Sequence, residues 1–359
     1  MRSKIFLLLA ANLACAPKVV EQPAPQSMPI LPSYKASVYT LAPTLPRDPL
    51  VRELLGDLPY DEALAGAATA LSLLLSRGDL TDSADVNWAC QRSGWPYPLS
   101  AHRQLVLPKD TAPDGLLTGL HLSPNSRIGV VRARSSETDI WVLLQSEVET
   151  PLAPVAMRYD VGDRLELPNT PEAPLIWRAT DPTGALLWPE QHLKLQLEGE
   201  WLIEGSRGEQ VLYRAALYVD MDTPETPLFE AEAPAAGLKA QEHQAWQMVS
   251  LAHQMFFATD EFIQRDPSLD RSAAMALKAA LNGEPVSNAE LRFEQLGFTR
   301  LPRNEVGCTG ASARECLDGL FWSAQTRGQV LNANHGVMGV AASELPDGQV
   351  AIMLNLASE

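Results

Sequence analysis

The spacing of hydrophobic and polar residues changes twice along this chain. Residues 50–150 carry apolar positions at helical spacing and then two apolar strands, whereas residues 151–223 show brief alternating stretches between turn residues. From residue 238 onward the helical spacing returns, and it again ends in two apolar strands. The pattern predicts an α+β chain in which an all-β part separates two mixed parts.

Cap and stop residues bound the helices predicted in the first mixed part. Asp61 opens an Ala/Leu-rich helix that Gly78 stops, and a second helix covers residues 82–92. We expect a third, short helix at 114–120, followed by the strands RIGVVRA and DIWVLLQS.

The second mixed part begins with a long helix over residues 238–263. Asp266-Pro267 opens the next helix, because proline suits a first helical turn. Capping boxes at 287–290 and 312–315 open two more helices, and the last ends at Phe321-Trp322-Ser323. A polar loop then leads into the strands GVMGVAAS and QVAIMLNL.

Five alternating stretches of residues 151–223, namely RLEL, LIWRA, LKLQL, WLIEG and VLYRAALYV, are separated by Pro, Gly, Asp and Asn. This arrangement is typical of a small antiparallel β-sandwich. The acidic, proline-bearing residues 224–237 are interpreted as a linker to the second mixed part.

The N-terminus, MRSKIFLLLAANLACAPK, has a basic start and an apolar run too short for a permanent membrane anchor. It predicts a secretory signal over residues 1–15. The end of this signal resembles a bacterial lipoprotein box, so lipidation of Cys15 is expected, with ordinary secretion as the alternative. Residues 16–49 contain eight prolines and predict a tether, with a short strand at 34–41.

Charge and cysteine content limit the classes of partner. The formal net charge is −16 and the pI about 4.8, which excludes nucleic acid and anionic membrane surfaces as partners. An exported chain can oxidise Cys308 and Cys316 to a disulfide or leave them reduced, and both states stay open. Cys90 is interpreted as a buried apolar residue. The sequence has no C-x-x-C pair and no Cys/His spacing typical of zinc sites.

The two mixed parts share an order of elements. Each has a helix after an acidic cap, a shorter helix that ends in Gly-aromatic, an Asp-Gly-Leu helix and paired strands. The matching segments are Gly94-Trp95 with Gly297-Phe298, 114–116 with 318–320, and Ile128-Gly129-Val130-Val131 with Val337-Met338-Gly339-Val340. We interpret this as a diverged internal repeat; two unrelated α+β pieces with similar turns are the alternative.

An ordered series of motifs in residues 238–359 points to a known family. The series is Asp266-Pro267-Ser268-Leu269 with Ala273, Trp322-Ser323 with Arg327, Gly336-Val337-Met338-Gly339-Val340, and the turn Asp347-Gly348. It resembles the CAP superfamily of cysteine-rich secretory, antigen 5 and pathogenesis-related proteins, in its bacterial multi-domain branch. The resemblance implies a C-terminal α/β/α sandwich, a central immunoglobulin-like sandwich and a diverged CAP-like block at 50–150.

The same resemblance implies a cleft of His and Glu side chains able to hold a divalent metal. Here Thr326 occupies the place of one histidine, and no histidine lies at 278–290. Glu305 takes the place of the family's glutamate, and His335 is a further weak candidate for catalysis. A single glutamate does not make a metal site, so neither a metal nor a cofactor is expected. Trp322, Thr326 and Arg327 are the candidate binding residues.

Other catalytic patterns are lacking. The sequence has no G-x-S-x-G and no glycine-rich phosphate loop, and Cys308 with His335 is the single conceivable nucleophile pair. Two aromatic turns, at residues 95–98 and 188–189, are interpreted as packed lids, with recognition loops as the alternative.

The leading functional hypothesis is a non-catalytic protein, anchored in the bacterial cell envelope, that binds a protein, glycan or lipid. The first alternative is a hydrolase of envelope polymers or peptides that uses Glu305. The second alternative is a structural component of an envelope assembly.

Overall fold

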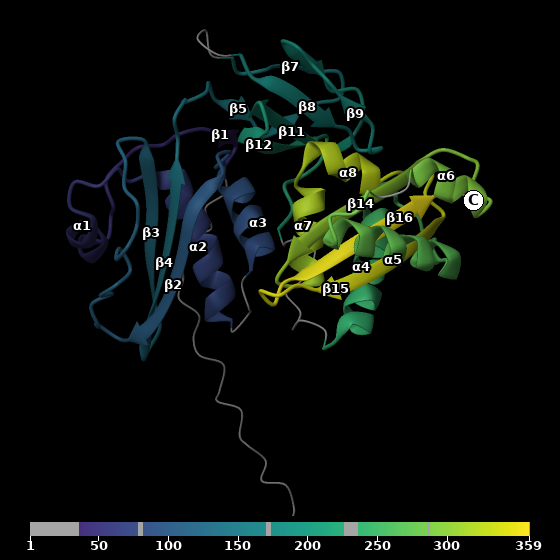
Figure 1. Cartoon of the computed structure of the whole chain (residues 1–359). Helices are drawn as coiled ribbons and strands as arrows, with labels where there is room; N and C mark the ends of the chain where they lie inside the picture. The colour runs from purple at the N-terminus through teal and green to yellow at the C-terminus, as the bar shows by residue number, and fades with distance from the viewer. Residues whose placement is uncertain (1–35, 78–81, 170–173, 226–235, 286–287, 359) are drawn as a thin grey trace, which may run out of the picture.

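The computed structural model describes residues 36–77, 82–169, 174–225, 236–285 and 288–358. Helices and sheets both occur, so the predicted α+β class is confirmed. The predicted signal and Cys15 lie outside the described residues. We divide the described residues into the N-terminal region (36–150), the middle region (151–225) and the C-terminal region (236–358). The domain limits themselves stay a prediction. Figure 1 shows their arrangement.

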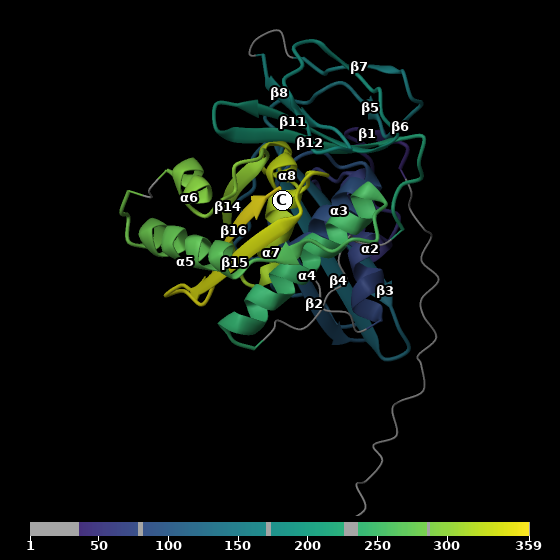
Figure 2. The same ribbon diagram turned by 90° about the vertical axis from the view of Figure 1, so that its right-hand side faces the viewer.

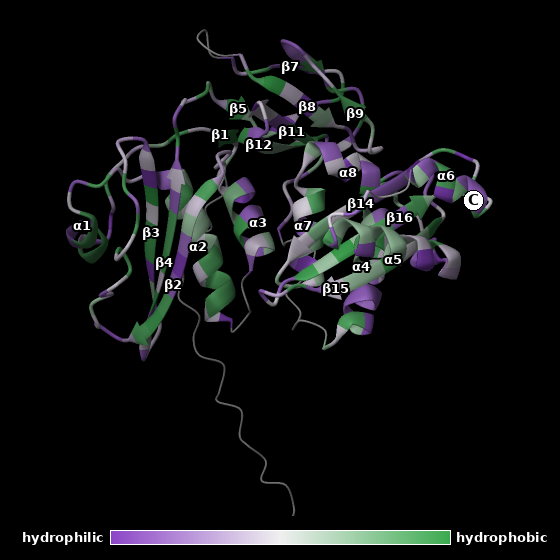
Figure 3. Cartoon of the chain, in the orientation of Figure 1, coloured by the Kyte–Doolittle hydropathy of each residue, from purple (hydrophilic) through white to green (hydrophobic). Residues whose placement is uncertain are grey.

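The N-terminal region lays helices against a three-stranded antiparallel sheet of order β2-β4-β3. Its elements are α1 (Pro49–Leu55), α2 (Glu62–Ser76), α3 (Ser83–Ser93), β2 (Leu99–Pro108), β3 (Ser126–Arg134) and β4 (Thr138–Glu147). Helix α2 begins where predicted, because the Asp61 carboxylate accepts the backbone N–H groups of Ala63 and Leu64. Figure 3 shows the largely hydrophobic α2 facing this sheet.

Two predictions for this region are wrong. Residues 114–120 form turns rather than a helix, yet Leu116 is still fully buried in the cluster that contains Trp141. Strand β2 was not predicted, because it lies at the sheet edge and none of its residues is fully buried. The predicted helix stop at Gly78 lies outside the described residues.

The C-terminal region has three layers. Its elements are α4 (Leu238–Phe257), β13 (Gln264–Arg265), α5 (Pro267–Leu281), α6 (Ala289–Gln295), β14 (Arg303–Gly310), α7 (Ala313–Phe321), α8 (Ala324–Val330), β15 (Val337–Glu344) and β16 (Val350–Ala357). The sheet has the order β13-β15-β16-β14. Met338 and Val340 pack with α4, α7 and α8, while Val337 and Ala341 pack on the opposite face, against α5 and α6.

Several details of this region differ from the predictions. Helix α4 ends at Phe257 rather than 263, where Ala258 takes a left-handed conformation. Asn288 caps α6 through its side chain, and Ser287 lies outside the described residues. The expected polar loop after Ser323 is helix α8, and strand β14 was not predicted, since its residues are polar and its partner β16 is distant in sequence.

The N-terminal and C-terminal regions share one frame. The N–H of the cap residue Asp61 donates to the Ile128 carbonyl at 2.9 Å, and the N–H of Asp266 donates to the Met338 carbonyl at 2.9 Å. The next residue in each strand is a glycine that touches the helix: a Cβ on Gly129 or Gly339 would lie 2.3 or 2.1 Å from helix backbone. In both helices the cap residue lies three positions before that contact. In both sheets the second strand of the hairpin lies between the first strand and a strand from earlier in the region.

The middle region contains mainly antiparallel strands. They are β5 (Val155–Ala156), β6 (Arg158–Tyr159), β7 (Arg164–Glu166), β8 (Ile176–Thr180), β9 (Leu186–Leu187), β10 (His192–Lys194), β11 (Gly199–Arg207) and β12 (Gln210–Val219). A five-stranded sheet, β6-β12-β11-β8-β9, is accompanied by the pair β10-β7, and β6 pairs parallel with β12. The predicted short strand at 34–41 is present as β1 (Val38–Tyr39), which pairs with β5.

The middle region packs on both other regions, above them in Figures 1 and 2. Towards the N-terminal region, the Tyr39 hydroxyl hydrogen-bonds Gln91 Oε1 at 2.9 Å and the Ala216 carbonyl at 2.8 Å. Towards the C-terminal region, Gly328 lies so close to the Gly184 carbonyl that a Cβ would be 2.1 Å from that oxygen. The two outer regions also meet each other, through α3 and α7.

Candidate functional site

The structure places Glu305 in an ion pair rather than in an open cleft. Its carboxylate, with 14% of the side chain exposed, accepts from the guanidinium of Arg292 in α6. Beside the pair, Arg292 Nε donates to Ser272 Oγ at 3.3 Å, and a 2.8 Å hydrogen bond joins Ser272 to the buried Asn355 side chain. The carboxylate is therefore neutralised by a fixed partner, which does not suit a general base.

His335 lies on the other face of the same sheet. It is 2% exposed, with Nε2 3.1 Å from Asn304 Nδ2 and Nδ1 3.3 Å from the Val330 carbonyl. Asn304 and Glu305 are neighbours in β14, so their side chains point to opposite faces. The structure therefore does not bring Glu305 and His335 together.

Burial fixes the charge state of His335. Removal from solvent lowers the pKa of its imidazole to about 4, and the nearby His253 contributes in the same direction. The ring is neutral near pH 7. Within the described ranges, no group of three or more His, Cys, Asp or Glu side chains could hold a metal ion.

The remaining nucleophile candidate is also occupied. Cys308 in β14 forms a disulfide with Cys316 in α7. Cys308 therefore has no thiolate for a reaction with His335 as base.

Of the three candidate binding residues, two line a pocket and one does not. The Thr326 hydroxyl donates to the Leu320 carbonyl at 2.8 Å and so fixes the turn from α7 to α8. Trp322 and Arg327 both line a cavity of about 300 Å³ at the place where the three regions meet. We call this cavity the junction pocket.

Five aromatic residues line the junction pocket. They come from all three regions: Trp88 of α3, Tyr218 of β12, Phe256 of α4, and Phe321 and Trp322 at the end of α7. Its volume is at the lower end of the range found for small-molecule sites, which favour positions between domains.

Besides the exposed Glu198, three ionisable side chains give the pocket its polarity. Arg327 pairs with Glu200 of β11 at 2.8 Å, and its guanidinium lies over the Phe256 ring, 4.7 Å from the centroid. The third group is Asp318, which is 5% exposed and accepts a 2.7 Å hydrogen bond from Asn87 Nδ2. Asp318 thus reaches from α7 to α3 across the junction.

Burial raises the pKa of Asp318 to about 7, and the negative charge of Asp82 acts in the same direction. The Asn87 hydrogen bond and the Arg314 charge lower it less. Arg314 itself is held by Asp82 at 2.7 Å and Asp85 at 2.9 Å, so it is shared among several carboxyl groups. A carboxyl that titrates near neutrality inside a pocket is a feature of functional sites.

Sequence reasoning missed Asp318, Glu200 and Trp88. Asp318 carried one usable signal, since it interrupts the apolar face of α7 between Leu317 and Leu320. Glu200 and Trp88 gave none, because their relevance depends on how distant regions pack.

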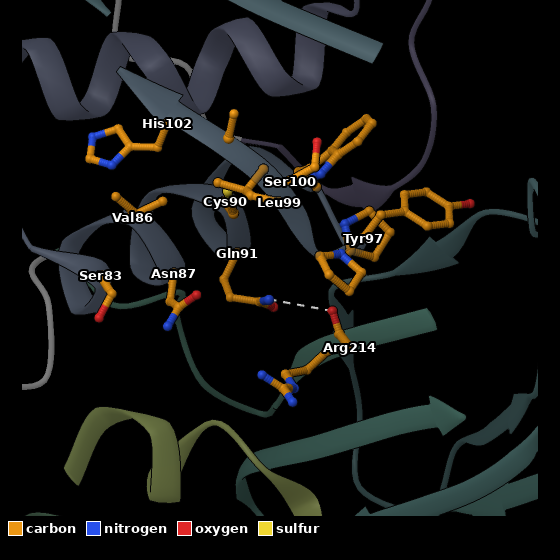
Figure 4. Close-up of a pocket in the computed structure, with 14 residues that line it drawn as sticks. Ser83, Val86, Asn87, Cys90, Gln91, Tyr97, Leu99, Ser100, His102 and Arg214 are labelled. Carbon is orange, nitrogen blue, oxygen red and sulfur yellow. Dashed lines mark hydrogen bonds between the residues drawn. The ribbon is translucent and has the colours of Figure 1, made fainter. Parts of the chain in front are cut away.

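A second cavity, of about 400 Å³, lies between α3 and residues 95–102 (Figure 4). Cys90 is buried beside it, and burial raises the pKa of its thiol to about 12, so the thiol stays protonated. Gln91 donates to the Arg214 carbonyl at 3.3 Å and accepts from the Ala216 N–H at 2.9 Å. These polar groups are used to join the N-terminal and middle regions.

The two aromatic turns differ. Trp95 and Tyr97 are 0% and 6% exposed, which agrees with their interpretation as packed residues. Trp188 is 57% exposed, so the interpretation of residues 188–189 as a packed lid is wrong. The Arg178 guanidinium lies 5.0 Å from the Trp188 ring centroid.

No helix of the described residues has the length and apolar character needed to cross a membrane. No protein-family model matches the sequence, and the comparison with curated proteins finds no match either.

Among solved structures, the chain is similar to an outer surface protein of Borrelia burgdorferi at 11% identity and TM-score 0.30, over 34% of this chain and 94% of that one. A cysteine-rich secretory protein of Staphylococcus aureus is similar at 10% identity and TM-score 0.29, over 73% and 86%. An extracellular protein with an SCP domain from Bacillus anthracis gives 10% and 0.28, over 61% and 82%. At these TM-scores the likenesses carry no argument about the site.

Proposed function

We propose that this chain is an exported, non-catalytic binding protein of the bacterial cell envelope, in which two CAP-like regions flank a β region and a small ligand occupies the junction pocket. One observation carries the proposal: an aromatic cavity with a buried carboxyl group and an ion pair lies where all three regions meet. Such sites suit small ligands that are held by apolar contact and oriented by few polar groups.

The state of the predicted catalytic residues supports binding over hydrolysis. Glu305 is paired with Arg292, His335 is buried on the opposite sheet face, and Cys308 is in a disulfide. We expect Glu305→Ala to leave any trace activity on peptidoglycan or peptide substrates unchanged. A loss of turnover in that variant would support the hydrolase alternative.

Ligand-dependent thermal stability tests the proposal. A library of small fragments is screened against the purified chain by differential scanning fluorimetry, because a ligand of the folded state raises its Tm by mass action. Hits should stabilise the wild type and Trp188→Ala, whose ring is exposed elsewhere, but not Trp322→Ala. Fragments that stabilise Trp322→Ala as strongly as the wild type would contradict a site in the junction pocket.

The envelope location has its own test. Labelling of the expressed full chain with a palmitate analogue should mark the wild type and not Cys15→Ala, if Cys15 is lipidated. Equal labelling of both would refute lipidation at this residue. A pull-down that recovers stoichiometric envelope proteins with wild type and Trp322→Ala alike would favour the structural-component alternative.

A further inference from the structure

Charge in and behind the junction pocket is unbalanced. Arg327, the cation of the pocket wall, pairs with Glu200 through Nη1 and lies over the face of Phe256, while its buried Nη2 has no hydrogen-bond partner among the described residues. Asp318 and the exposed Glu198 also line the pocket and have no guanidinium or ammonium group in the pocket wall. The pocket lining therefore carries one more acidic group than its ion pair requires, even with Asp318 counted as neutral.

The surroundings of Asp318 reinforce this imbalance. Behind the pocket wall, Asp82 and Asp85 of the α3 start share a single guanidinium, that of Arg314. Together with Asp318 they make three carboxyl groups around one cation. A fixed excess of one sign in a cavity with apolar walls attracts ligands of the opposite sign.

The aromatic residues of the pocket wall also favour a positively charged ligand. Ring faces attract cations through their quadrupole. Two such cation–π contacts occur at this junction. The Arg92 guanidinium lies 5.6 Å from the Trp88 ring centroid, and that of Arg327 lies 4.7 Å from the Phe256 centroid. Among the described residues, no guanidinium is found over the rings of Tyr218 and Trp322, which also line the pocket.

We propose that the junction pocket binds an organic cation, that is, a small molecule with an ammonium or quaternary ammonium group on an apolar body. This inference rests on the proposed function and specifies its ligand class. The cationic group lies towards Asp318, and the apolar body contacts Tyr218 and Trp322. An anionic ligand would face Asp318 and Glu198, and the one cation of the pocket wall, Arg327, already shares its charge with Glu200. A neutral ligand would leave the excess negative charge unbalanced.

Binding should depend on pH in a defined direction. An organic cation prefers the ionised form of Asp318, whose pKa is raised to about 7 by burial, so its affinity should rise with pH up to about 7 and then level off. Binding in turn lowers the pKa of that carboxyl. The charged groups around Asp318 are Asp82 and Asp85 of α3, Arg314 of α7, Glu200 of β11, Arg327 of α8, and Glu198.

Isothermal titration calorimetry with three aromatic probes of one size tests the inference. The probes are 2-phenylethylamine as cation, 2-phenylethanol as neutral analogue and phenylacetate as anion, each at pH 5.5 and 8.0. We expect the amine to bind at least tenfold more tightly than the alcohol at pH 8.0, and phenylacetate to bind most weakly. The affinity of the amine should fall about tenfold or more at pH 5.5, while that of the alcohol stays constant.

Variants separate the role of Asp318 from effects on folding. Asp318→Asn keeps the shape of the side chain and should reduce amine affinity to that of the alcohol and remove its pH dependence. Asp347→Asn, in the exposed turn between β15 and β16, should bind like the wild type. If Asp318→Asn does not fold, Trp322→Leu provides the second variant, and it should weaken the amine and the alcohol together.

Two outcomes would overturn the inference. If phenylacetate or 2-phenylethanol binds more tightly than the amine, the ligand is not an organic cation. The junction pocket would still be a binding site. If none of the three probes binds, the inference of an organic cation is also refuted. The proposed function is refuted as well only if the fragment screen finds no ligand whose binding depends on Trp322.

Discussion

The N-terminal and C-terminal regions use the same frame and cover it differently. In both, a capped helix touches a strand glycine, at Gly129 and at Gly339. The outer sheet face of the C-terminal region is covered by α4, α7 and α8, whereas α1 and the turns around Leu116 cover that of the N-terminal region. The junction pocket takes its side chains from α3, α4, α7, α8 and the middle region, so the site belongs to the contact between the regions and not to the frame that the two regions share.

This difference places the junction pocket outside the frame that the two regions share. The candidate catalytic residues Glu305 and His335 lie in the C-terminal region and are engaged in structural contacts. The pocket arises only because the two regions are turned towards each other through α3 and α7. The predictions that follow test whether the frames are equivalent and whether the contact between them is essential.

The largest effect is expected at the contact between the regions. Arg314 is 3% exposed and pairs with the buried Asp85, so Arg314→Met leaves a buried carboxylate without its partner. We expect a loss of about 3–5 kcal/mol in the free energy of unfolding, measured by urea denaturation. Arg47→Ala removes an exposed ion pair with Glu62 and is the control, with no measurable change. Equal, small effects for both variants would show that the regions do not depend on this contact.

The next largest effect concerns His335, which lies four residues before Gly339 and is buried. The corresponding residue of the N-terminal region, Asn125, lies four residues before Gly129 and is exposed. Burial lowers the pKa of His335 in the folded state to about 4, from 6.5. The unfolded chain then binds more protons between these values, so this residue costs stability as the pH falls from 6.5 to 4, by about 3 kcal/mol in total.

Asp318 acts in the opposite direction over much of the same range, because its pKa is raised. The test is therefore the difference between wild type and His335→Gln in urea unfolding at pH 7.0 and 4.5. The wild type should lose more stability than the variant over this range. Parallel pH profiles would show that His335 is not buried as a neutral ring.

The disulfide is a further difference between the regions. Cys308–Cys316 ties β14 to α7 in the C-terminal region, whereas Cys90 of the N-terminal region is a free, buried cysteine. Closing so short a loop stabilises a protein by about 2.5 kcal/mol through the unfolded state. Cys308→Ser/Cys316→Ser should lose about that amount in urea unfolding. Cys90→Ser should leave disulfide content unchanged in a thiol assay, and a shift in that content would mean that the pairing is different.

The smallest effect tests the shared frame itself. Gly129→Ala and Gly339→Ala each force a Cβ against helix backbone, and each should cost about 2 kcal/mol in the free energy of unfolding. Gly319→Ala, in an exposed position of α7 with no atom near the added Cβ, should be neutral or slightly stabilising. A large cost at one strand glycine and none at the other would argue against a common frame.

Local signals made much of the fold predictable. The caps at Asp61, Asp82, Asp266 and Ser312 place helices α2, α3, α5 and α7 where expected, because a side-chain cap is encoded within a few residues. The edge strands β2 and β14 were not predicted. Each becomes a strand by pairing with a strand that lies far along the chain, and its own residues do not indicate that pairing. In the turns at 114–120, Gly115 and Gly119 have φ of +90° and +71°, which is incompatible with a continuous helix.

The site was predictable only in part. Trp322 and Arg327 were found from the resemblance, and both line the junction pocket, although Thr326 between them does not. Asp318 and Glu200 come from segments that the sequence connects in no visible way. Their juxtaposition results from packing among three regions, which no local pattern encodes.

The central claim is that ligands bind at the junction of the three regions and not beside Glu305. Hydrogen–deuterium exchange with mass spectrometry, with and without saturating 2-phenylethylamine at pH 8.0, tests it most directly. The account predicts slower exchange together in α3, at the start of β11 and in α7. Slower exchange confined to α5, α6 and β14, the elements around Glu305, would contradict it.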